Sequence, residues 1–218
     1  MTDDDALKRF PSEKLSPTTV YFEGLLTFNP YVDIPPVIWH AVTIHLAPID
    51  LGGDARYPDV CGTTVDTTMR LGGIILPHRR WQDFGGTLGP VEDQGASSIY
   101  VSNAHNPIDI LEVTFTRKQG LVFQIDLDIN IEFEFEGAGF SDTRCSLSVE
   151  APYSGIRFRV PEWTNPDEVE FPEEWGIPDE FNVGTVHDLF GRFIDTTCFE
   201  LSSEGSEFTL APVEGPPN

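Results

Sequence analysis

The chain has 218 residues, 39% of them hydrophobic, and its 36 acidic residues against 13 basic ones give a formal net charge of −23. A chain of this sign is repelled by nucleic acids and anionic lipid headgroups, so direct nucleic-acid binding is not expected. No apolar run approaches the roughly 20 residues of a membrane-spanning helix and no secretory signal opens the sequence, so we expect residence inside a cell.

Most of the basic residues are arginines. Lys8, Lys14 and Lys118 are the lysines, and the other basic residues are arginines. Hydrated carboxylates keep a surface soluble in molar salt, where a Debye length of about 3 Å removes the repulsion between them. The composition therefore favours adaptation to high salt. An acidic protein from an arginine-preferring genome is the alternative.

Residues 1–17 are polar and charged, which predicts a loose N-terminal arm ahead of the folded part. Leu7, Phe10 and Leu15 are apolar side chains within this arm. We expect them to be assembly anchors that a neighbouring molecule could bury.

Residues 18–211 are predicted to form a single β domain, because short β segments follow one another between Gly, Pro and Asn. The expected strands are 20–28, 37–46, 63–76, 98–102, 110–116, 121–136, 145–150, 156–160, 198–201 and 207–210.

The segment 121–136 decides the fold class, because apolar and polar residues alternate along it with a period of two, which excludes a helix. One buried face and one wet face are typical of antiparallel sheets. We therefore predict an all-β, antiparallel, jelly-roll-like barrel or sandwich. The loop 117–120 joins segment 121–136 to 110–116 as a hairpin, and the long strand is expected to bend and serve two parts of the sheet.

An acidic loop is expected at 161–182, where Trp163, Phe171 and Trp175 are further candidate assembly anchors. One short helix follows near the C-terminus. Its predicted capping box is Thr185 with Asp188, and its apolar face is lined by Val186, Leu189, Phe190 and Phe193. Residues 212–218 are expected to form an extended tail.

The sequence contains no recognisable catalytic arrangement. Nucleotide-binding glycine loops, the Gly-x-Ser-x-Gly elbow and zinc-protease spacing are all missing, so no catalytic, cofactor-binding or metal-binding residue is predicted. His40 shares strand parity with apolar residues, which favours a buried, hydrogen-bonded histidine over a ligand or a base. The basic cluster 78–81 is expected to make an internal acid-binding contact or a subunit contact.

The three cysteines lie far apart, which excludes a Cys-x-x-Cys pair. Cys145 is expected in the core. Cys61 and Cys198 are candidate thiols for an intersubunit disulfide, with free buried cysteine as the alternative.

At whole-chain level the sequence resembles the single β-barrel (jelly-roll) capsid proteins of halophilic internal-membrane viruses. The likeness lies in the salt-adapted composition, the number of strands, the arm and the spare cysteines, and no motif carries it. The resemblance implies a non-enzymatic shell subunit in a virion assembled in the host cytoplasm. Its implied partners are copies of itself and a second capsid protein, over a membrane that it does not span.

Two alternatives remain. The first is a cytoplasmic acidic binding module, such as an immunity or inhibitor protein that presents rows of carboxylates to a basic toxin or nuclease. The second is a hydrolase or isomerase in a β-barrel whose site shows no motif.

Overall fold

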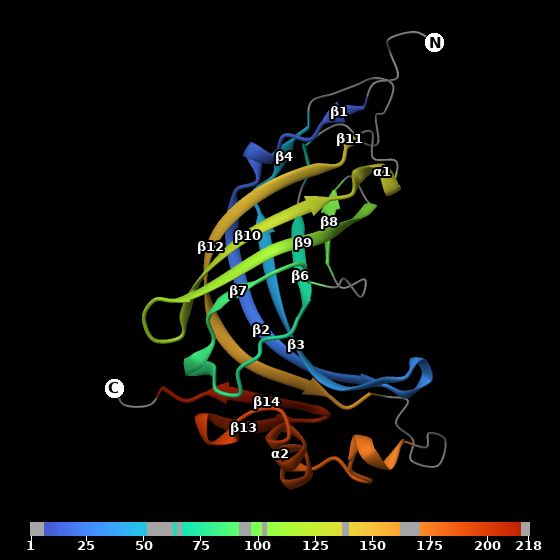
Figure 1. Cartoon of the computed structure of the whole chain (residues 1–218), viewed down its shortest axis with the longest axis vertical. Helices are drawn as coiled ribbons and strands as arrows, with labels where there is room; N and C mark the ends of the chain where they lie inside the picture. Colours follow the sequence, from blue (N-terminus) through green and yellow to red (C-terminus); the bar gives the residue numbers. More distant parts are fainter. Residues whose placement is uncertain are drawn as a thin grey trace.

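A computed structural model describes residues 7–51, 63–64, 67–91, 97–101, 104–136, 140–161 and 171–214 (Figure 1). The strands are β1 Lys8–Arg9, β2 Pro17–Asn29, β3 Ile34–Leu46, β4 Ile49–Asp50, β5 Thr63–Thr64, β6 Thr68–Ile74, β7 Gly86–Leu88, β8 Ser98–Val101, β9 Ala104–Arg117, β10 Val122–Ile131, β11 Phe140–Ser141, β12 Thr143–Arg159, β13 Phe199–Glu204 and β14 Glu207–Pro212. The helices are α1 Phe133–Glu136 and α2 Val183–Gly191, with 3-10 turns at Ser12–Lys14, Pro30–Val32, Trp81–Asp83, Glu173–Trp175 and Thr196–Cys198.

Strands β2, β3, β6, β8, β9, β10 and β12 form a closed ring, because β12 pairs with both β10 and β2. Each pairing in the ring is antiparallel except that of β12 with β2, which is parallel. The all-β antiparallel class is thus confirmed. The jelly-roll topology is not found, because the ring follows chain order from β2 to β12, as in a meander, and not by Greek-key crossings.

Strand β12 belongs to two parts of the molecule. Its first half pairs with β10, and its last residues pair with β2 on one side and β14 on the other. Gly155 has φ +101°, and a Cβ there would lie 2.1 Å from the carbonyl oxygen of Leu210. Glycine therefore lets the β14 backbone approach where β12 leaves β10.

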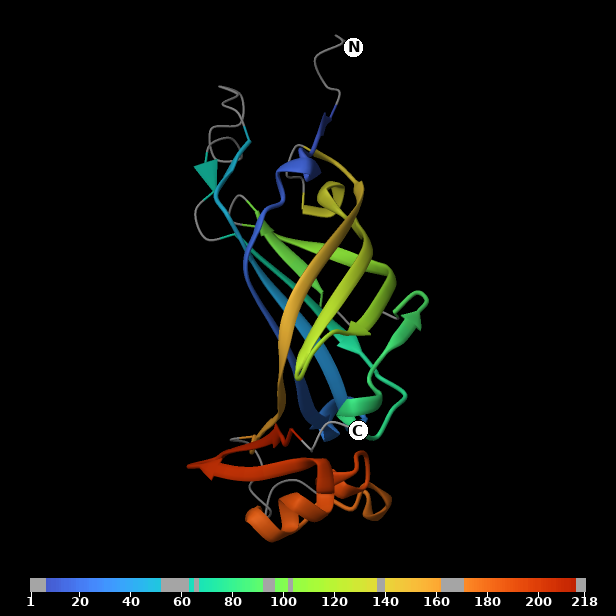
Figure 2. The ribbon, with the colours of Figure 1, turned by 90° about the vertical axis from the view of Figure 1, so that its left-hand side faces the viewer.

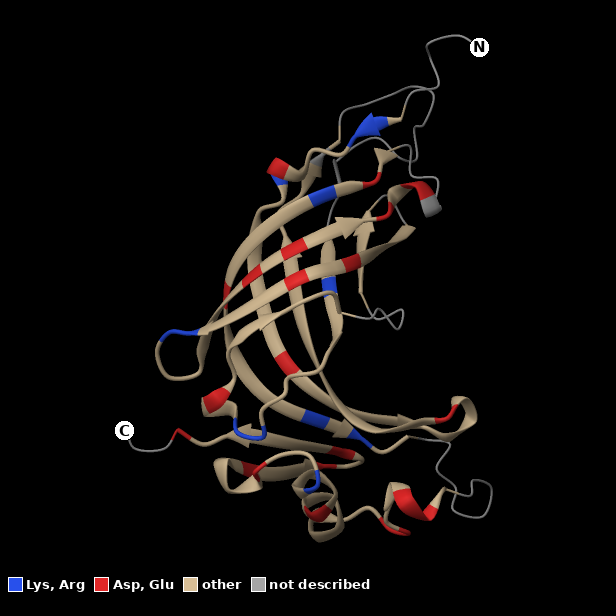
Figure 3. Ribbon diagram, in the orientation of Figure 1, with Lys and Arg blue, Asp and Glu red and all other residues tan. Residues whose placement is uncertain are grey.

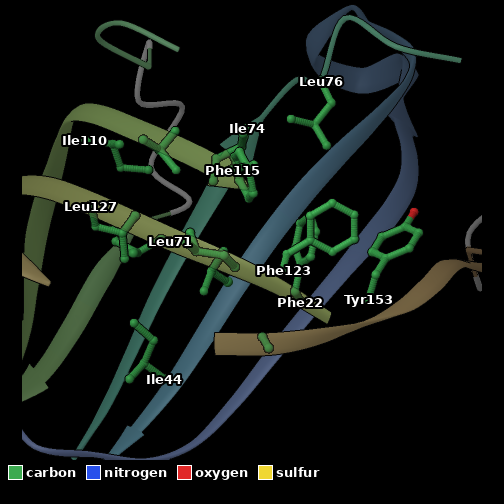
Figure 4. Close-up of a cluster of buried hydrophobic side chains, with 14 of the residues drawn as sticks. Phe22, Ile44, Leu71, Ile74, Leu76, Ile110, Phe115, Phe123, Leu127 and Tyr153 are labelled. Carbon is green, nitrogen blue, oxygen red and sulfur yellow. The ribbon is translucent and has the colours of Figure 1, made fainter. Parts of the chain in front are cut away.

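Alternation of burial along the strands produces the core. In β10 the inward residues Phe123, Ile125, Leu127, Ile129 and Ile131 are all at most 2% exposed, and the residues between them are half-buried. Figure 4 shows side chains from the two strands that flank β12, Phe22 of β2 and Phe123 of β10, meeting inside the barrel. The barrel interior is therefore a packed core in this region.

A second layer lies at the end of the barrel where β12 finishes, and it contains the β13–β14 hairpin and α2 (Figure 2). Aromatic rings join the two parts: Phe28 and Phe158 lie 5.8 Å apart, and Phe158 also contacts Phe190 and Phe208. The predicted C-terminal helix is confirmed. It packs against β13, and its buried Phe190 also contacts Phe158 of β12.

The capping box of α2 begins at Asn182, three residues earlier than predicted. Asn182 Oδ1 accepts hydrogen bonds from the backbone N–H of Gly184 (2.9 Å) and Thr185 (3.1 Å), and Thr185 Oγ1 accepts one from Asn182 N–H (3.0 Å). Val186, Leu189 and Phe190 are buried as expected, whereas Phe193 lies beyond the helix and is half-buried.

Replacing Asn182 with alanine should lower the free energy of unfolding by about 1 kcal/mol, because two backbone donors lose their acceptor. Urea denaturation followed by circular dichroism measures it. Asn182→Asp keeps an acceptor at the helix N-terminus and should retain most of the stability. An equal loss in both variants would contradict the capping role.

Two expectations about single strands need correction. The alternation from 121 to 136 does not form one strand, because β10 ends at Ile131 and Phe133–Glu136 is helical. Asp142 Oδ1 accepts the backbone N–H of Glu134 at 3.0 Å and stabilises this turn. The long strand that serves two parts of the sheet is β12, which joins the segments predicted separately at 145–150 and 156–160.

Candidate functional site

Three neighbouring strands carry carboxylates on the outer surface of the barrel. We name this surface the acidic face; it comprises Asp109 and Glu112 of β9, Asp126 and Asp128 of β10, and Glu150 of β12. Acidic bands cross β9 and β10 in Figure 3. Each of these residues alternates with a buried neighbour, so the carboxylates point away from the core.

The register of the sheet brings like charges together. Glu112 lies directly opposite Asp128 in the β9–β10 ladder. Arg144 of β12 reaches this group through its bond to Asp128, and Lys118 interacts electrostatically with Asp126. Like charges directly opposite each other destabilise a sheet by up to about 1 kcal/mol, so a cation placed between them from outside would be favourable.

Two of the carboxylates are held in fixed positions. Asp126 accepts hydrogen bonds from Ser148 Oγ (2.6 Å) and Gln124 Nε2 (3.0 Å), and these bonds lower its pKa. Arg144 donates to both oxygens of Asp128, which lowers the pKa of Asp128. Both groups are therefore ionised at neutral pH, and the acidic face is a preorganised negative surface.

The expected arm anchors are mostly part of the chain's own core. Phe10 is 0% exposed and its ring lies 4.5 Å from that of Phe133, and Leu15 is 7% exposed. Strand β1 pairs with β11, which holds this segment on the barrel. Phe10 and Leu15 are thus not exposed anchors, because Phe133 and Phe140 already cover Phe10. Leu7 remains 49% exposed.

The anchors in the acidic loop are placed similarly. Trp175 is 7% exposed, and the half-buried Phe171 contacts Phe28 with ring centroids 5.7 Å apart. Arg192 donates to the carbonyl oxygens of Trp175 and Glu174, which holds this segment beside α2. These side chains pack within the chain, and the expectation that a neighbour buries them is corrected. Trp163 lies outside the described residues.

The cysteines that the structure describes are not exposed. Cys198 is 7% exposed, because it sits in a 3-10 turn beneath Trp81 and not on the outward face of β13; the expectation of an accessible intersubunit thiol is corrected. Cys145 is half-buried, and burial raises its pKa to about 11. Cys61 lies outside the described residues.

The basic cluster makes internal contacts. Arg79 donates to the carbonyl oxygens of Gly191 and Ile194, and Arg80 lies 3.8 Å from Asp195. Trp81 Nε1 donates to Cys198 O at 3.1 Å. The cluster therefore holds the segment after β6 against the layer that contains β13, β14 and α2. This is the internal contact that was one of the two expected for the cluster.

The barrel interior contains polar atoms without partners. His40 of β3 is 3% exposed and Tyr153 of β12 is 1% exposed, and their ring centroids are 6.0 Å apart. Neither ring nitrogen of His40, nor the Tyr153 hydroxyl, makes a hydrogen bond of normal geometry to a described residue. The burial of His40 is confirmed, and its expected hydrogen-bond partner is the backbone of Ile74, which lies opposite it in the β3–β6 pairing, although outside normal geometry.

Burial controls the charge of both groups. Desolvation lowers the pKa of His40 to about 3, and the backbone of Ile74 only partly opposes this shift. Desolvation also raises the pKa of Tyr153 well above its ordinary value. Both side chains are therefore neutral at physiological pH. Tyr153 was not among the predicted site residues, although it shares strand parity with Val149 and Ala151.

Among the residues that the structure describes, no group of three or more His, Cys, Asp or Glu side chains is arranged to hold a metal ion. Within the same ranges no helix combines the length and apolarity needed to cross a bilayer. No protein-family model, curated protein or solved structure matches the chain.

Proposed function

We propose that the protein is an acidic binding module whose acidic face binds a basic protein, in the manner of an inhibitor or immunity protein for a cationic toxin or nuclease. The observation that carries the proposal is the register that sets Glu112 opposite Asp128. In the free chain Arg144 already pairs with Asp128, so an arginine or lysine of a partner would supply the cation beside Glu112.

Preorganisation supports the same proposal. Asp126 and Asp128 are already held by Ser148 and Arg144, so little side-chain freedom is lost on binding. The net charge of −23 would steer a basic partner towards the protein and raise the association rate at low ionic strength.

The experiment begins with the full-length protein immobilised at low ionic strength and exposed to a lysate of its source cells. The retained proteins are identified by mass spectrometry, and the dissociation constant of each purified basic candidate is then measured. The double variant Glu112→Gln/Asp128→Asn should weaken binding of the partner by roughly tenfold or more, because two charges are lost from the contact.

The matched control is Glu200→Gln/Glu204→Gln, which removes the same charge from exposed positions of β13. It should change the dissociation constant less than twofold. If both double variants weaken binding equally, net charge and not the acidic face governs the interaction, and the proposal fails.

A shell subunit is the second candidate, and the open edge of β13 favours it. Among the described strands β13 pairs with β14 alone and ends the sheet, so its other edge is free to pair with a second copy. In that case the partners would be further copies and a second capsid protein. Light scattering in molar salt tests this function, since a strictly monomeric protein at high concentration would exclude it.

A further inference from the structure

The outer surface of the barrel on the side away from the acidic face has a different chemistry. It is formed by β2, β3, β6 and β8, and β3 and β6 lie farthest from β10 around the ring. In Figure 1, β9 and β10 cross in front of β3 and β6. Acidic residues make up 36 of the 218 residues of the chain, yet β3, β6 and β8 contain no Asp or Glu at any position. Three neighbouring strands therefore present no carboxylate to the outside.

The register of the sheet places the outward side chains of these strands in rows. Tyr21 of β2 lies opposite Thr43 of β3, which lies opposite Arg70 of β6. One row further along, His45 of β3 lies opposite Thr68 of β6. These positions alternate with buried residues, so their side chains point away from the core. We name this surface the acid-free wall; it comprises Tyr21, Thr43, His45, Thr68, Arg70 and Tyr100.

Two tyrosines dominate the acid-free wall. Tyr21 is 51% exposed and Tyr100 of β8 is 38% exposed. The ring of Tyr21 contacts His45 edge to face, with centroids 5.7 Å apart, and that of Tyr100 contacts His105 in the same way at 5.0 Å. His45 Nδ1 lies 3.3 Å from Thr68 Oγ1, which fixes the imidazole in turn. Both phenol rings are therefore held in place and would lose little freedom when a partner covers them.

The distribution of charge indicates which partner fits this wall. A basic protein is attracted to the acidic face instead, and an anion would find Arg70 as the cation of the wall. Two copies of the chain, each with a net charge of −23, repel each other wherever carboxylates meet. At the acid-free wall two copies can touch without that repulsion. Glu23, the next outward residue on β2, is already paired with Arg157 at 2.6 Å.

The wall is large enough for a weak dimer. Four strands about 4.8 Å apart, followed over about seven residues of about 3.3 Å each, outline about 450 Å2. Ile75, which is 55% exposed just beyond β6, and the half-buried Trp39 of β3 extend the apolar part of this surface. Two copies would bury about 1,000 Å2 in total, which is the lower end for a specific interface. Exposed aromatic rings and few charges are also typical of the centre of an interface.

We propose that the acid-free wall is a self-association surface, on which the same wall of a second copy packs face to face about a two-fold axis. The two acidic faces of such a dimer point away from the contact and stay accessible. The self-association surface is separate from the acidic face, and its failure would leave the proposed function intact.

The test measures the mass of the full-length protein by sedimentation equilibrium in molar NaCl, where a Debye length of about 3 Å screens the net charge. The wild type should be a mixture of monomer and dimer with a dissociation constant in the micromolar range. Tyr21→Asp/Tyr100→Asp should raise this constant by about tenfold or more, because each copy loses two rings from the contact and brings two carboxylates into it. Circular dichroism should show unchanged β structure, since both positions are exposed.

The matched control is Thr116→Asp/Ser146→Asp, which adds the same charge at exposed positions of β9 and β12. It should change the dissociation constant less than about twofold. If the first variant does not fold, Tyr21→Ser/Tyr100→Ser removes the rings without adding charge and should still weaken the dimer. The proposal is overturned if the wild type is a monomer at about 1 mM in molar salt. It is also overturned if the tyrosine variants dimerise like the wild type, or if the control weakens the dimer as much as they do.

Discussion

Replacing Phe115 with aspartate should prevent the chain from folding. Phe115 of β9 is 2% exposed, and its ring stacks 5.1 Å from that of Phe22. The substitution removes a buried ring, at about 3 to 5 kcal/mol, and buries an unpaired carboxylate, which costs several kcal/mol more. The sum is comparable with the whole free energy of unfolding of a typical domain, about 5 to 15 kcal/mol. Circular dichroism and size-exclusion chromatography should show loss of β structure and aggregation.

Thr116→Asp is the matched control, because it introduces the same charge one residue later on the exposed side of β9, beside Arg117. It should change the free energy of unfolding by no more than about 0.5 kcal/mol. If Phe115→Asp is tolerated and Thr116→Asp is not, the faces of β9 are assigned the wrong way round.

The second large effect concerns pH. The folded pKa of His40 is about 3, below the ordinary value of 6.5, because burial disfavours the charged ring. Below pH 6.5 the unfolded chain therefore binds a proton at this position that the folded chain does not, and the free energy of unfolding falls as the pH falls. At about 1.4 kcal/mol per pH unit, the loss from pH 6.5 to 4.5 is about 2 kcal/mol.

The measurement compares urea denaturation of wild type and His40→Phe across this range. As the pH falls from 6.5 to 4.5, the free energy of unfolding of the wild type should fall by about 2 kcal/mol relative to that of His40→Phe. The carboxylates with lowered pKa, such as Asp126 and Asp195, contribute stability that is lost only as the pH falls through about 4 and below, and they do so in both proteins. A difference that is independent of pH would mean that His40 is hydrated or hydrogen-bonded in solution.

Much of the fold follows from local pattern. The alternation in β10 and the glycine-containing loop before it predict the hairpin with β9, because both signals lie within a few residues of each other. The end of β10 could not be predicted from the pattern. The strand ends at Ile131, but Phe133 and Phe135 continue the alternation of apolar and polar residues in the sequence. That end depends on Asp142, which reaches Glu134 from a later part of the chain.

The candidate sites depend even more on tertiary structure. The acidic rows are visible in the sequence, and the pairing of Glu112 with Asp128 keeps the register in which Phe123 lies opposite Arg117 at the hairpin. The register shift after Asp128, which sets Asp109 opposite Asn130, could not be predicted. The burial of Phe10 and Trp175 was not predictable, because an apolar side chain in a polar segment can pack on its own chain or on a neighbour. The meeting of His40 with Tyr153 requires closure of the whole ring.

The closure of the ring also sets the order in which the strands can pair during synthesis. Ser154 Oγ bonds to the carbonyl oxygen of Phe22, a partner 132 residues earlier in the chain. On the ribosome, β2 therefore emerges long before the strand that covers its second edge, and that edge stays open while the intervening strands are translated. Contacts of this sequence separation slow folding, so the chain carries an exposed strand edge for most of its translation. A chaperone that binds β2 would cover this open edge before β12 is made. A translational pause before β12 would lengthen the time for which the edge stays open.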